Sequence, residues 1–461
     1  MRRRWLERFL ESIADRGRTL VRARHDRTLA GLLRALLSGR GEASGTAMSR
    51  EVLQAYERMN AEERLRFFQM LEREFSPNRE EVRARAEEYL RTGETDDFLA
   101  LSRAVEPPRQ ELFRRMNMAP GGTAALVAMR AELLGLLKRH PELGVVEADL
   151  AHLLASWFNR GFLTLERIDW HSPADVLEKL IRYDTVHQIQ GWDDLQRRLA
   201  PDRRCFAFFH PALPGVPLIF LEVALVKGMS SEIGPLIDPN APVLDPRQAD
   251  SAIFYSINNT QRGLKGLAFG NFLIKQVLED LGAELPRLRT LATLSPVPGF
   301  AAALRAARAG EHPAFTPERL ERLLAPHREA LTRAAGPLLP ADALFHLLEH
   351  EPLRHRALLA EVLERLVLAY LTLLPPRGPG YDPVAAFHLA NGARLERINP
   401  FSDGSSQGRD AAFGVKVNYR YDPDIVVENH EQFVEEGVID MSRHLARLHE
   451  RIAAEWKSAA A

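Results

Sequence analysis

Residues 251–300 contain the most informative pattern for the fold and read SAIFYSINNTQRGLKGLAFGNFLIKQVLEDLGAELPRLRTLATLSPVPGF. Residues 252–257 are an apolar run that predicts a strand, and the glycines of 262–266 predict a turn after it. Apolar residues then recur at helical spacing at Phe272, Ile274, Val277 and Leu281. Residues 288–294 predict a second strand, which should end at Ser295 because proline disfavours a helical backbone in the residue before it. The stretch therefore predicts strand, turn, helix and strand, with Ser295 at a strand end.

The turn of this unit is also a candidate site for a phosphate group. Helix N-termini carry unpaired N–H groups that bind anions, and ligands of open α/β sheets collect beyond the carboxyl ends of strands. Arg262 and Lys265 add positive charge to the turn. The loop has neither the Gly-x-Gly-x-x-Gly of dinucleotide sites nor the Gly-Lys-Ser/Thr of a P-loop. It is nearer to the acyl-CoA pyrophosphate loop of the GNAT acetyltransferases, with a different spacing, and a plain turn is the alternative.

The composition favours a small-molecule or protein partner. The chain has 461 residues, of which 46% are hydrophobic and 27% charged, and its formal net charge is -1. No overall basic charge therefore points to nucleic acid or to a membrane surface. The single cysteine, Cys205, cannot form an internal disulfide and lies among phenylalanines, which predicts a buried thiol. No apolar run approaches the ~18 residues of a membrane helix, and the first residues lack a signal-peptide core, so we expect a cytoplasmic protein.

The first third of the chain, residues 1–156, is expected to be an all-α domain. Helical signals repeat in it, including Asn60 followed three residues later by Glu63, which is typical of a capping box. Proline and glycine breaks are spaced as turns between the helices of a bundle. Its arginines alternate with glutamates at spacings that favour surface pairs, so we expect them to be solvated and assign no chemistry to this region.

The second part, residues 157–461, is expected to be a mixed α/β domain, which makes the fold class α+β. Strands near residues 163, 206, 221, 254 and 291 are expected to form one sheet. A helical insertion is expected at about 315–375 because long apolar faces recur there at helical spacing. Two more short strands are expected at 395–398 and 415–421, separated by a polar loop rich in Ser, Gly and Asp. A last helix at 430–456 completes the prediction.

Three polar side chains outside the turn are candidates for chemistry, and each has a structural alternative. Ser295 precedes a proline and does not lie in a Gly-x-Ser-x-Gly elbow, so a turn serine is the alternative and α/β-hydrolase chemistry is not expected. His388 lies between two apolar residues, where a histidine is usually part of the core. Tyr421, like Tyr419, alternates with polar residues, which by itself predicts only a half-polar strand face.

Taken together, the motifs of the second part resemble the malonyl-CoA decarboxylase family. They follow the family's order at close to its spacing over most of residues 157–421, and the N-terminal region resembles the family more weakly. The two most specific motifs are Leu294-Ser-Pro-Val-Pro-Gly-Phe300 and Phe387-His-Leu-Ala-Asn-Gly-Ala393. The others are HPALPGVPL (210–218), FYSI (254–257), QRGLKG (261–266), FLIK (272–275), RIN (397–399) and NYRY (418–421). The resemblance implies an N-terminal helical bundle and a C-terminal GNAT-like, acetyltransferase-like domain.

The resemblance also implies site residues. The family's catalytic serine falls on Ser295, its catalytic histidine on His388 and the last tyrosine of its Asn-Tyr-Arg-Tyr motif on Tyr421. Its acyl-CoA-binding stretch falls on 265–271. With the charged turn, the candidate binding residues are Arg262, Gly263, Lys265, Gly266, Leu267, Ala268, Phe269, Gly270 and Asn271. Animal members have a glutamate where this chain has Ala268, so the glutamate is not expected to be a general requirement.

The activity that the resemblance implies is decarboxylation of malonyl-CoA to acetyl-CoA and CO2. Loss of CO2 leaves an enolate, so the site must stabilise an oxyanion and protonate carbon, which requires neither a metal nor a redox cofactor beyond the CoA thioester substrate. A histidine near its ordinary pKa would suit the proton donor. Ser295 would bind the departing carboxylate or act as the proton acceptor, and the sequence does not choose between these roles.

Partners and other function classes follow from the same resemblance. The family implies a homo-oligomer, dimer or tetramer, assembled through the helical domain, whereas the net charge of -1 predicts no nucleic acid and no membrane as partner. A GNAT-type acyltransferase with the same CoA site is the alternative. Only the expected fold supports it, and fold does not determine function. A non-catalytic CoA sensor or assembly protein, with the helical domain as its working part, is a third class.

Overall fold

The computed structural model describes residues 29–38, 42–267, 273–376, 378 and 380–457. The chain forms two compact units. Unit 1 is Met1–Thr164 with Phe209–Leu218 and Asn259–Ala268, and unit 2 is Leu165–Phe208, Ile219–Asn258 and Phe269–Ala461. Two segments from beyond residue 157 therefore pack with the N-terminal helices, which a boundary drawn along the sequence cannot reveal.

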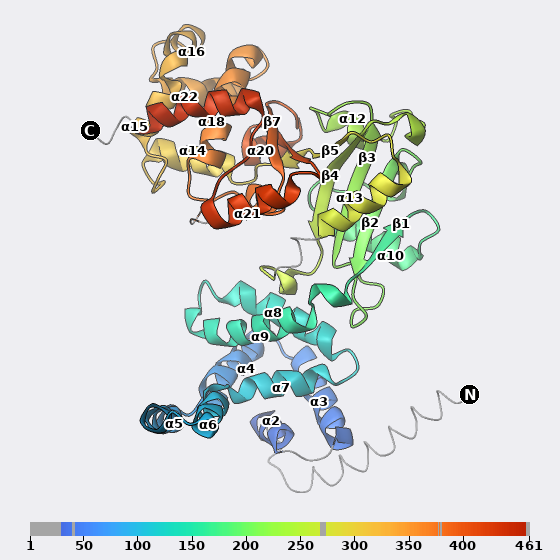
Figure 1. The fold of residues 1–461 in the computed structure, drawn as a ribbon, viewed down its shortest axis with the longest axis vertical. Helices are drawn as coiled ribbons and strands as arrows, with labels where there is room; N and C mark the ends of the chain where they lie inside the picture. The colour runs from blue at the N-terminus through green and yellow to red at the C-terminus, as the bar shows by residue number, and fades with distance from the viewer. Residues whose placement is uncertain (1–28, 39–41, 268–272, 377, 379, 458–461) are drawn as a thin grey trace. The chain divides into compact units, whose positions relative to one another are not determined.

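Unit 1 is built mainly from helices (Figure 1). They are α2 (Leu29–Leu37), α3 (Glu42–Glu57), α4 (Ala61–Glu74), α5 (Arg79–Thr92), α6 (Thr95–Val105), α7 (Pro108–Asn117), α8 (Gly122–Leu136) and α9 (Gly144–Trp157), with 3-10 turns η1 (Pro141–Leu143) and η2 (Arg160–Phe162). The capping box predicted before α4 is confirmed, because Asn60 and Glu63 each accept the other's backbone N–H. Apolar side chains of α4, α7, α8 and α9, such as Phe68, Phe113 and Leu133, form one core.

The expectation that the arginines of this region are solvated is wrong for Arg109 and Arg130. Both are buried, Arg109 beside Asp149 and Arg130 beside Glu147. A guanidinium taken out of water needs a charged or hydrogen-bonded partner, and each of these arginines has one. The alternation of arginine and glutamate along the sequence therefore describes the surface pairs of this unit but not these two buried ones.

Helices α5 and α6 form a hairpin in which no residue is fully buried. Four large apolar side chains on it are exposed to solvent: Leu90, Phe98, Leu99 and Val105. Tyr89 and Phe98 contact each other through their rings across the hairpin. Helices in water usually gain their stability by burying an apolar face, and this hairpin buries little of its own.

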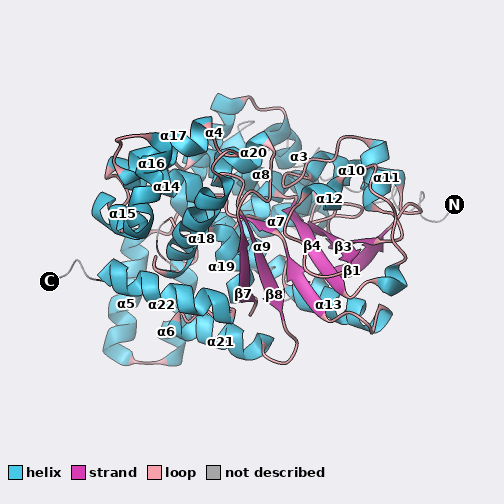
Figure 2. Cartoon of the chain, turned by 90° about the horizontal axis from the view of Figure 1, so that it is seen from above, coloured by secondary structure: helices cyan, strands magenta, loops and turns pink. Residues whose placement is uncertain are grey.

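The sheet of the protein contains all eight described strands. They are β1 (Thr164–Ile168), β2 (Arg203–Phe209), β3 (Ile219–Val226), β4 (Ser251–Asn259), β5 (Thr290–Thr293), β6 (Ser295–Pro296), β7 (Arg394–Asn399) and β8 (Lys416–Tyr421). Their order is β1-β2-β3-β4-β5-β8-β6, and β7 also pairs with β8. The five predicted strands are confirmed as one sheet, and Figure 2 shows β3, β4, β7 and β8 among its strands. The parallel pair β4 and β5 is connected by a helix, as predicted.

The helices of unit 2 confirm the predicted mixed α+β class and the helical insertion. The insertion contains α15 (Pro317–Leu324), α16 (Arg328–Ala335), α17 (Pro340–His350) and α18 (Arg356–Thr372). The other helices are α10 (Ala174–Tyr183), α11 (Trp192–Arg198), α12 (Gly234–Ile237), α13 (Leu273–Glu284), α14 (Phe300–Ala309), α19 (Pro383–Ala390), α20 (Ser406–Ala412), α21 (Val426–Glu436) and α22 (Arg443–Lys457). No helix in these described parts of the chain is long and apolar enough to cross a membrane.

Two details of the C-terminal prediction are wrong. The single last helix expected at 430–456 is two helices, because Gly437 has a φ of 72° and ends α21. A left-handed backbone favours glycine and interrupts a helix. The segment between the last two strands was expected to be a polar loop, whereas it contains α20, which Ser405 caps by accepting the Gly408 N–H. The buried thiol predicted at Cys205 is confirmed.

Candidate active site

Ser295 begins β6, a two-residue strand that pairs with β8. Its partner in the antiparallel register is Val417. Alternate residues of an extended chain point to the same side, so Thr293 and Ser295 share a face, and their hydroxyl oxygens lie 2.9 Å apart. Ser295 is only 5% exposed. The strand pattern does break around Ser295 as predicted, but the serine is inside the sheet region instead of in a solvent-exposed turn.

His388 reaches Ser295 from helix α19. This helix starts after Asp382, whose side chain accepts the N–H groups of Val384 and Ala385, and proline occupies its first turn. The Nε2 atom of His388 lies 2.9 Å from Ser295 Oγ, although 93 residues separate the two in sequence. His388 is 2% exposed, so the pair is shielded from water. The two side chains that the sequence offered separately, as a turn serine and a core histidine, are therefore in direct contact.

Tyr421 and Tyr419 of β8 hold the other side of the His388 ring. The Tyr421 hydroxyl lies 2.8 Å from His388 Nδ1. The Tyr419 ring stacks on the imidazole at a centroid distance of 4.7 Å and an interplanar angle of 24°. Both tyrosines are buried. The structure thus brings together Ser295, His388 and Tyr421, the three residues that the resemblance implied.

Thr293, Ser295, His388 and Tyr421 form one hydrogen-bonded chain. A neutral imidazole carries a single N–H, so the protons of this chain point in one of two directions. Either Tyr421 donates to Nδ1 and His388 donates from Nε2 to Ser295, or Ser295 donates to Nε2 and His388 donates from Nδ1 to Tyr421. In both arrangements every link is made without an ionised group, so the chain can pass a proton along its length.

Burial keeps the hydrogen-bonded side chains of this site neutral. It lowers the pKa of His388 to about 3, well below the ordinary range of an imidazole. Burial also raises the pKa of the Tyr421 and Tyr419 phenols well above their usual value. The expectation that the histidine keeps an ordinary pKa is therefore wrong, because burial removes water from the imidazolium form and no carboxylate among the described residues hydrogen-bonds to the ring in its place.

Asn418 fixes the strands behind the site. Its side chain donates to the Thr293 carbonyl at 2.6 Å and to the Ser230 carbonyl at 3.1 Å. Its oxygen accepts from Arg397 and Asn399, and the neighbouring Tyr419 N–H donates to Thr293 Oγ1. Sequence reasoning missed Thr293 and did not assign Asn418 a role. The signal for Asn418 was present, since it begins the Asn-Tyr-Arg-Tyr motif and points away from the two tyrosines.

The predicted phosphate turn belongs to unit 1 and is described up to Leu267. Arg262–Leu264 form the 3-10 turn η4, and Gly266 has a φ of 80°, which favours glycine. Arg262 and Lys265 are exposed, so their charges are accessible to an anion. The candidates Ala268, Phe269, Gly270 and Asn271 lie outside the described residues, as does the segment just before α13.

Arg130 of α8 holds the backbone of this turn. Its Nη1 donates to the Gly263 carbonyl at 2.7 Å and to the Lys265 carbonyl at 3.0 Å. Its Nε and Nη2 donate to Glu147. Gly263 packs so closely on α8 that a Cβ atom there would overlap the Val127 carbonyl. Sequence reasoning missed Arg130, and the available signal was an arginine next to the apolar stripe of a predicted helix.

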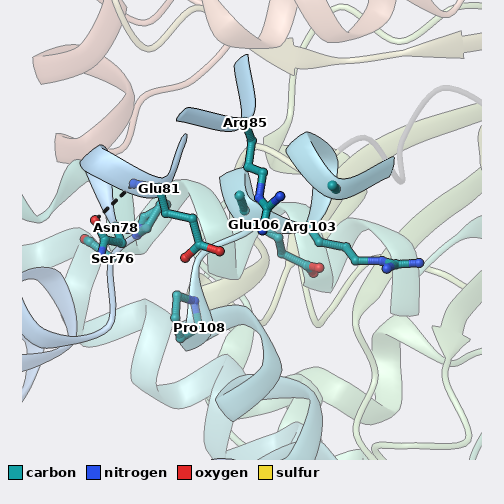
Figure 3. A pocket seen from close by; sticks show the side chains of 10 residues that line it. Ser76, Asn78, Glu81, Arg85, Arg103, Glu106 and Pro108 are labelled. Carbon is teal, nitrogen blue, oxygen red and sulfur yellow. Dashed lines mark hydrogen bonds between the residues drawn. The ribbon is translucent and has the colours of Figure 1, made fainter. Parts of the chain in front are cut away.

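A cavity of about 380 Å³ lies in unit 1, between the loop before α5, helices α5 and α6, and the start of α7 (Figure 3). Glu81, Glu106, Arg85 and Arg103 line it, so its charged groups have both signs. None of the predicted site residues lines this cavity.

Comparisons with known proteins cover almost the whole described chain. The model of the malonyl-CoA decarboxylase C-terminal domain matches residues 161–461, and that of the N-terminal domain matches residues 75–158. The crystal structure of malonyl-CoA decarboxylase from Rhodopseudomonas palustris is 43% identical, with a TM-score of 0.82 over 91% of this chain and 98% of that one. The enzyme from Agrobacterium vitis is 42% identical, with a TM-score of 0.79 over 91% and 99%.

Mitochondrial malonyl-CoA decarboxylase of Mus musculus is 36% identical over 336 residues. The alignment covers 69% of this chain and 66% of the mouse protein, slightly less than two thirds of its length.

Proposed function

This chain belongs to the malonyl-CoA decarboxylase family, a family of carboxy-lyases, and we propose that it converts malonyl-CoA to acetyl-CoA and CO2. The observation that carries the proposal is the buried hydrogen bond between Ser295 Oγ and His388 Nε2, continued by Tyr421 at Nδ1. Its place would be in the turnover of malonyl-CoA and hence in fatty acid metabolism. The second part of the chain would act as an acetyltransferase-like catalytic domain.

The reaction breaks the bond between the malonyl carboxylate and the carbon next to the thioester. The electron pair moves to the thioester oxygen as an enolate, CO2 leaves, and the carbon then takes up one proton. Hydrogen-bond donors in a water-excluded site stabilise the developing oxyanion more strongly than donors in water do. Ser295 and His388 would supply this stabilisation. Each of them is the donor of the bond between Oγ and Nε2 in one of the two proton arrangements.

Substrate binding would change the protonation of His388. In the free protein the buried imidazole is neutral, since its pKa is about 3. A malonyl carboxylate brought beside it adds a negative charge that favours the protonated ring. His388 would therefore become an acid only in the complex, and it would deliver the proton to the enolate carbon directly or through Ser295.

The turn of residues 262–267 would hold the nucleotide of CoA. CoA carries a pyrophosphate and a 3′-phosphate, and exposed Arg262 and Lys265 offer two positive charges on a turn with a glycine backbone. Arg130 restrains that backbone from behind through the Gly263 and Lys265 carbonyls. The binding energy of the nucleotide would thus come from a surface that takes no part in the chemistry.

Incubation of the purified chain with malonyl-CoA alone tests the proposal. A decarboxylase yields acetyl-CoA and CO2 without an acceptor, a GNAT-type acyltransferase yields product only when an amine is added, and a sensor yields neither. We also propose that no metal or redox cofactor takes part. Overnight treatment with EDTA should then leave the initial rate unchanged, and a loss restored by a divalent ion would contradict this part.

We further propose that the chain forms a homo-oligomer, a dimer or tetramer, through unit 1. The exposed apolar side chains of the α5–α6 hairpin support a surface that another copy covers. Light scattering after size exclusion should give a multiple of 51.9 kDa. Replacing Leu90 and Phe98 by glutamate should lower that mass to the monomer, and an unchanged oligomer would exclude the hairpin as the contact.

A further inference from the structure

Asp382 connects the two segments that carry Ser295 and His388. We propose that this buried carboxylate is a positioning residue that sets the distance between the two catalytic side chains. The inference rests on the proposed decarboxylase function and concerns a residue that does not touch the imidazole or the serine hydroxyl.

One oxygen of Asp382 fixes the helix of His388. Oδ1 accepts the N–H groups of Val384 and Ala385, each at 3.0 Å, and so caps the start of α19. This helix has only 8 residues, and so short a helix is marginal on its own. His388 lies in its second turn, so the direction of the imidazole depends on how the first turn is held.

The other oxygen of Asp382 fixes the segment of Ser295. Oδ2 accepts the N–H of Gly299 at 3.3 Å, at the start of α14. Between Ser295 and Gly299 the chain is Pro296-Val297-Pro298, and each proline ring locks its φ angle. The three-residue link is therefore stiff, and anchoring Gly299 restrains Ser295 as well.

The buried surroundings strengthen these three bonds relative to the same bonds in water. Asp382 is 1% exposed, and burial raises the pKa of its carboxyl while the three backbone N–H groups act to lower it. Hydrogen bonds that involve a carboxylate in a low-dielectric interior are stronger than neutral ones. The carboxylate has two oxygens aimed at two different segments, so it joins them in a way that an ordinary helix cap does not.

A substitution at Gly299 is a second, independent way to disturb the hydrogen bond between the Gly299 N–H and Asp382. A Cβ atom at this position would overlap the Tyr370 hydroxyl, while the ring carbon behind that hydroxyl lies at an ordinary 3.6 Å. Gly299→Ala should therefore displace the N–H that Asp382 accepts. Tyr370→Phe removes the obstructing oxygen, whose own bond to the Gly380 carbonyl is 3.3 Å long, and should allow the alanine to fit.

The central test compares Asp382→Asn with Thr316→Ala, a control variant that removes the cap of another helix. Asparagine still caps α19 through its carbonyl oxygen, but the amide nitrogen in place of Oδ2 cannot accept the Gly299 N–H. We expect kcat to fall roughly 10- to 100-fold, as a displacement of about 1 Å does, with the KM for malonyl-CoA within threefold. The Thr316 hydroxyl caps α15 by accepting the Arg319 N–H. Thr316→Ala removes this cap and should lower the melting temperature without changing kcat.

Gly299→Ala and its double variant with Tyr370→Phe give a second test of the same role. Gly299→Ala should lower kcat by a similar factor, and the double variant with Tyr370→Phe should recover most of it. Wild-type kcat in Asp382→Asn, or no recovery in the double variant, would overturn the positioning role.

Wild-type protein without decarboxylase activity would instead reject the proposed function. In that case the ¹⁵N shifts of the His388 imidazole still report its bond to Ser295. They should change in Asp382→Asn and stay unchanged in Thr316→Ala, and identical shifts in all three proteins would overturn the inference.

Discussion

Ser295 and His388 are almost inaccessible to water and hold each other through side-chain hydrogen bonds, whereas Arg262 and Lys265 are exposed on a turn whose backbone Arg130 restrains. In the first region burial keeps the side chains neutral, and hydrogen bonds with Thr293 and Tyr421 hold Ser295 and His388 in place. In the second region the charges stay in water, where, under the proposed function, they would attract the phosphates of CoA. The difference indicates that substitutions in the two regions should change different kinetic constants.

The largest effect is expected for His388→Asn. Asparagine keeps a polar side chain that fits within the space of the imidazole but cannot carry a proton to the enolate, and a general acid contributes on the order of 10² to 10⁴ in rate. We expect kcat to fall at least about a hundredfold. Calorimetric titration with free CoA should give an unchanged affinity. Turnover within a few-fold of wild type would remove His388 from the reaction and erase the contrast between the two regions.

Tyr421→Phe should have a smaller effect at the same region. It removes the hydroxyl that lies 2.8 Å from His388 Nδ1 and leaves that buried nitrogen without a partner. The cost of such an unpaired group is about 1–3 kcal/mol, or roughly 5- to 150-fold if it appears in the transition state. Steady-state kinetics should show it in kcat and not in KM. A variant whose KM alone rises would place Tyr421 in substrate binding.

Gly266→Asp probes the exposed region. The substitution places a negative charge on the turn beside Arg262 and Lys265, and the repulsion should weaken malonyl-CoA, acetyl-CoA and free CoA alike, by about fivefold or ~1 kcal/mol. Gly121→Asp is a matched control, because Gly121 has a φ of 75° against 80° for Gly266 and also borders open space. Weaker malonyl-CoA binding with unchanged CoA binding would mean that the turn contacts the acyl end.

The smallest expected effect is the absence of a break near pH 6.5 in the profile of kcat/KM. Burial lowers the pKa of His388 from 6.5 to about 3, so the free protein holds this ring neutral throughout pH 5 to 8. The profile of kcat/KM reports the free protein. Because the ring takes up a proton when substrate binds, kcat/KM should fall steadily as the pH rises through this range, without a plateau. The profile of kcat can show a break, since the bound carboxylate favours the protonated ring. A plateau of kcat/KM that ends near pH 6.5 would mean that His388 is hydrated before substrate binds.

Local periodicity predicted most of the fold. The helices of unit 1 and the strands of the sheet follow apolar spacings that are visible along the sequence, and so does the insertion between α14 and α19. The failures came where backbone conformation decided the outcome. Gly437 splits the last helix through a left-handed residue, and the polar residues before Phe413 form α20 with a serine cap. Polarity alone could not distinguish that short helix from a loop.

The candidate site was predicted in part, and the part that failed depends on distant contacts. Ser295, His388 and Tyr421 lie in motifs that resemble a known family, and the structure brings them together. Arg130 was missed because its partner carbonyl, that of Gly263, is 133 residues away. Thr293 and Asp382 were missed for the same reason, since nothing near them in sequence indicates which backbone or hydroxyl groups they contact. The lowered pKa of His388 also follows only from burial, which the sequence does not report.

The most direct test of the central claim is decarboxylation in D2O by the wild type and by Ser295→Ala. Malonyl-CoA is supplied without an acceptor, and the acetyl-CoA formed is examined by mass spectrometry and NMR. The wild type should release one CO2 per acetyl-CoA and place one solvent deuteron on the acetyl carbon. Ser295→Ala should do so at least about a hundredfold more slowly while binding CoA normally. No acetyl-CoA from the wild type, or an equal rate in the alanine variant, would contradict the claim that the buried serine–histidine pair carries out this reaction.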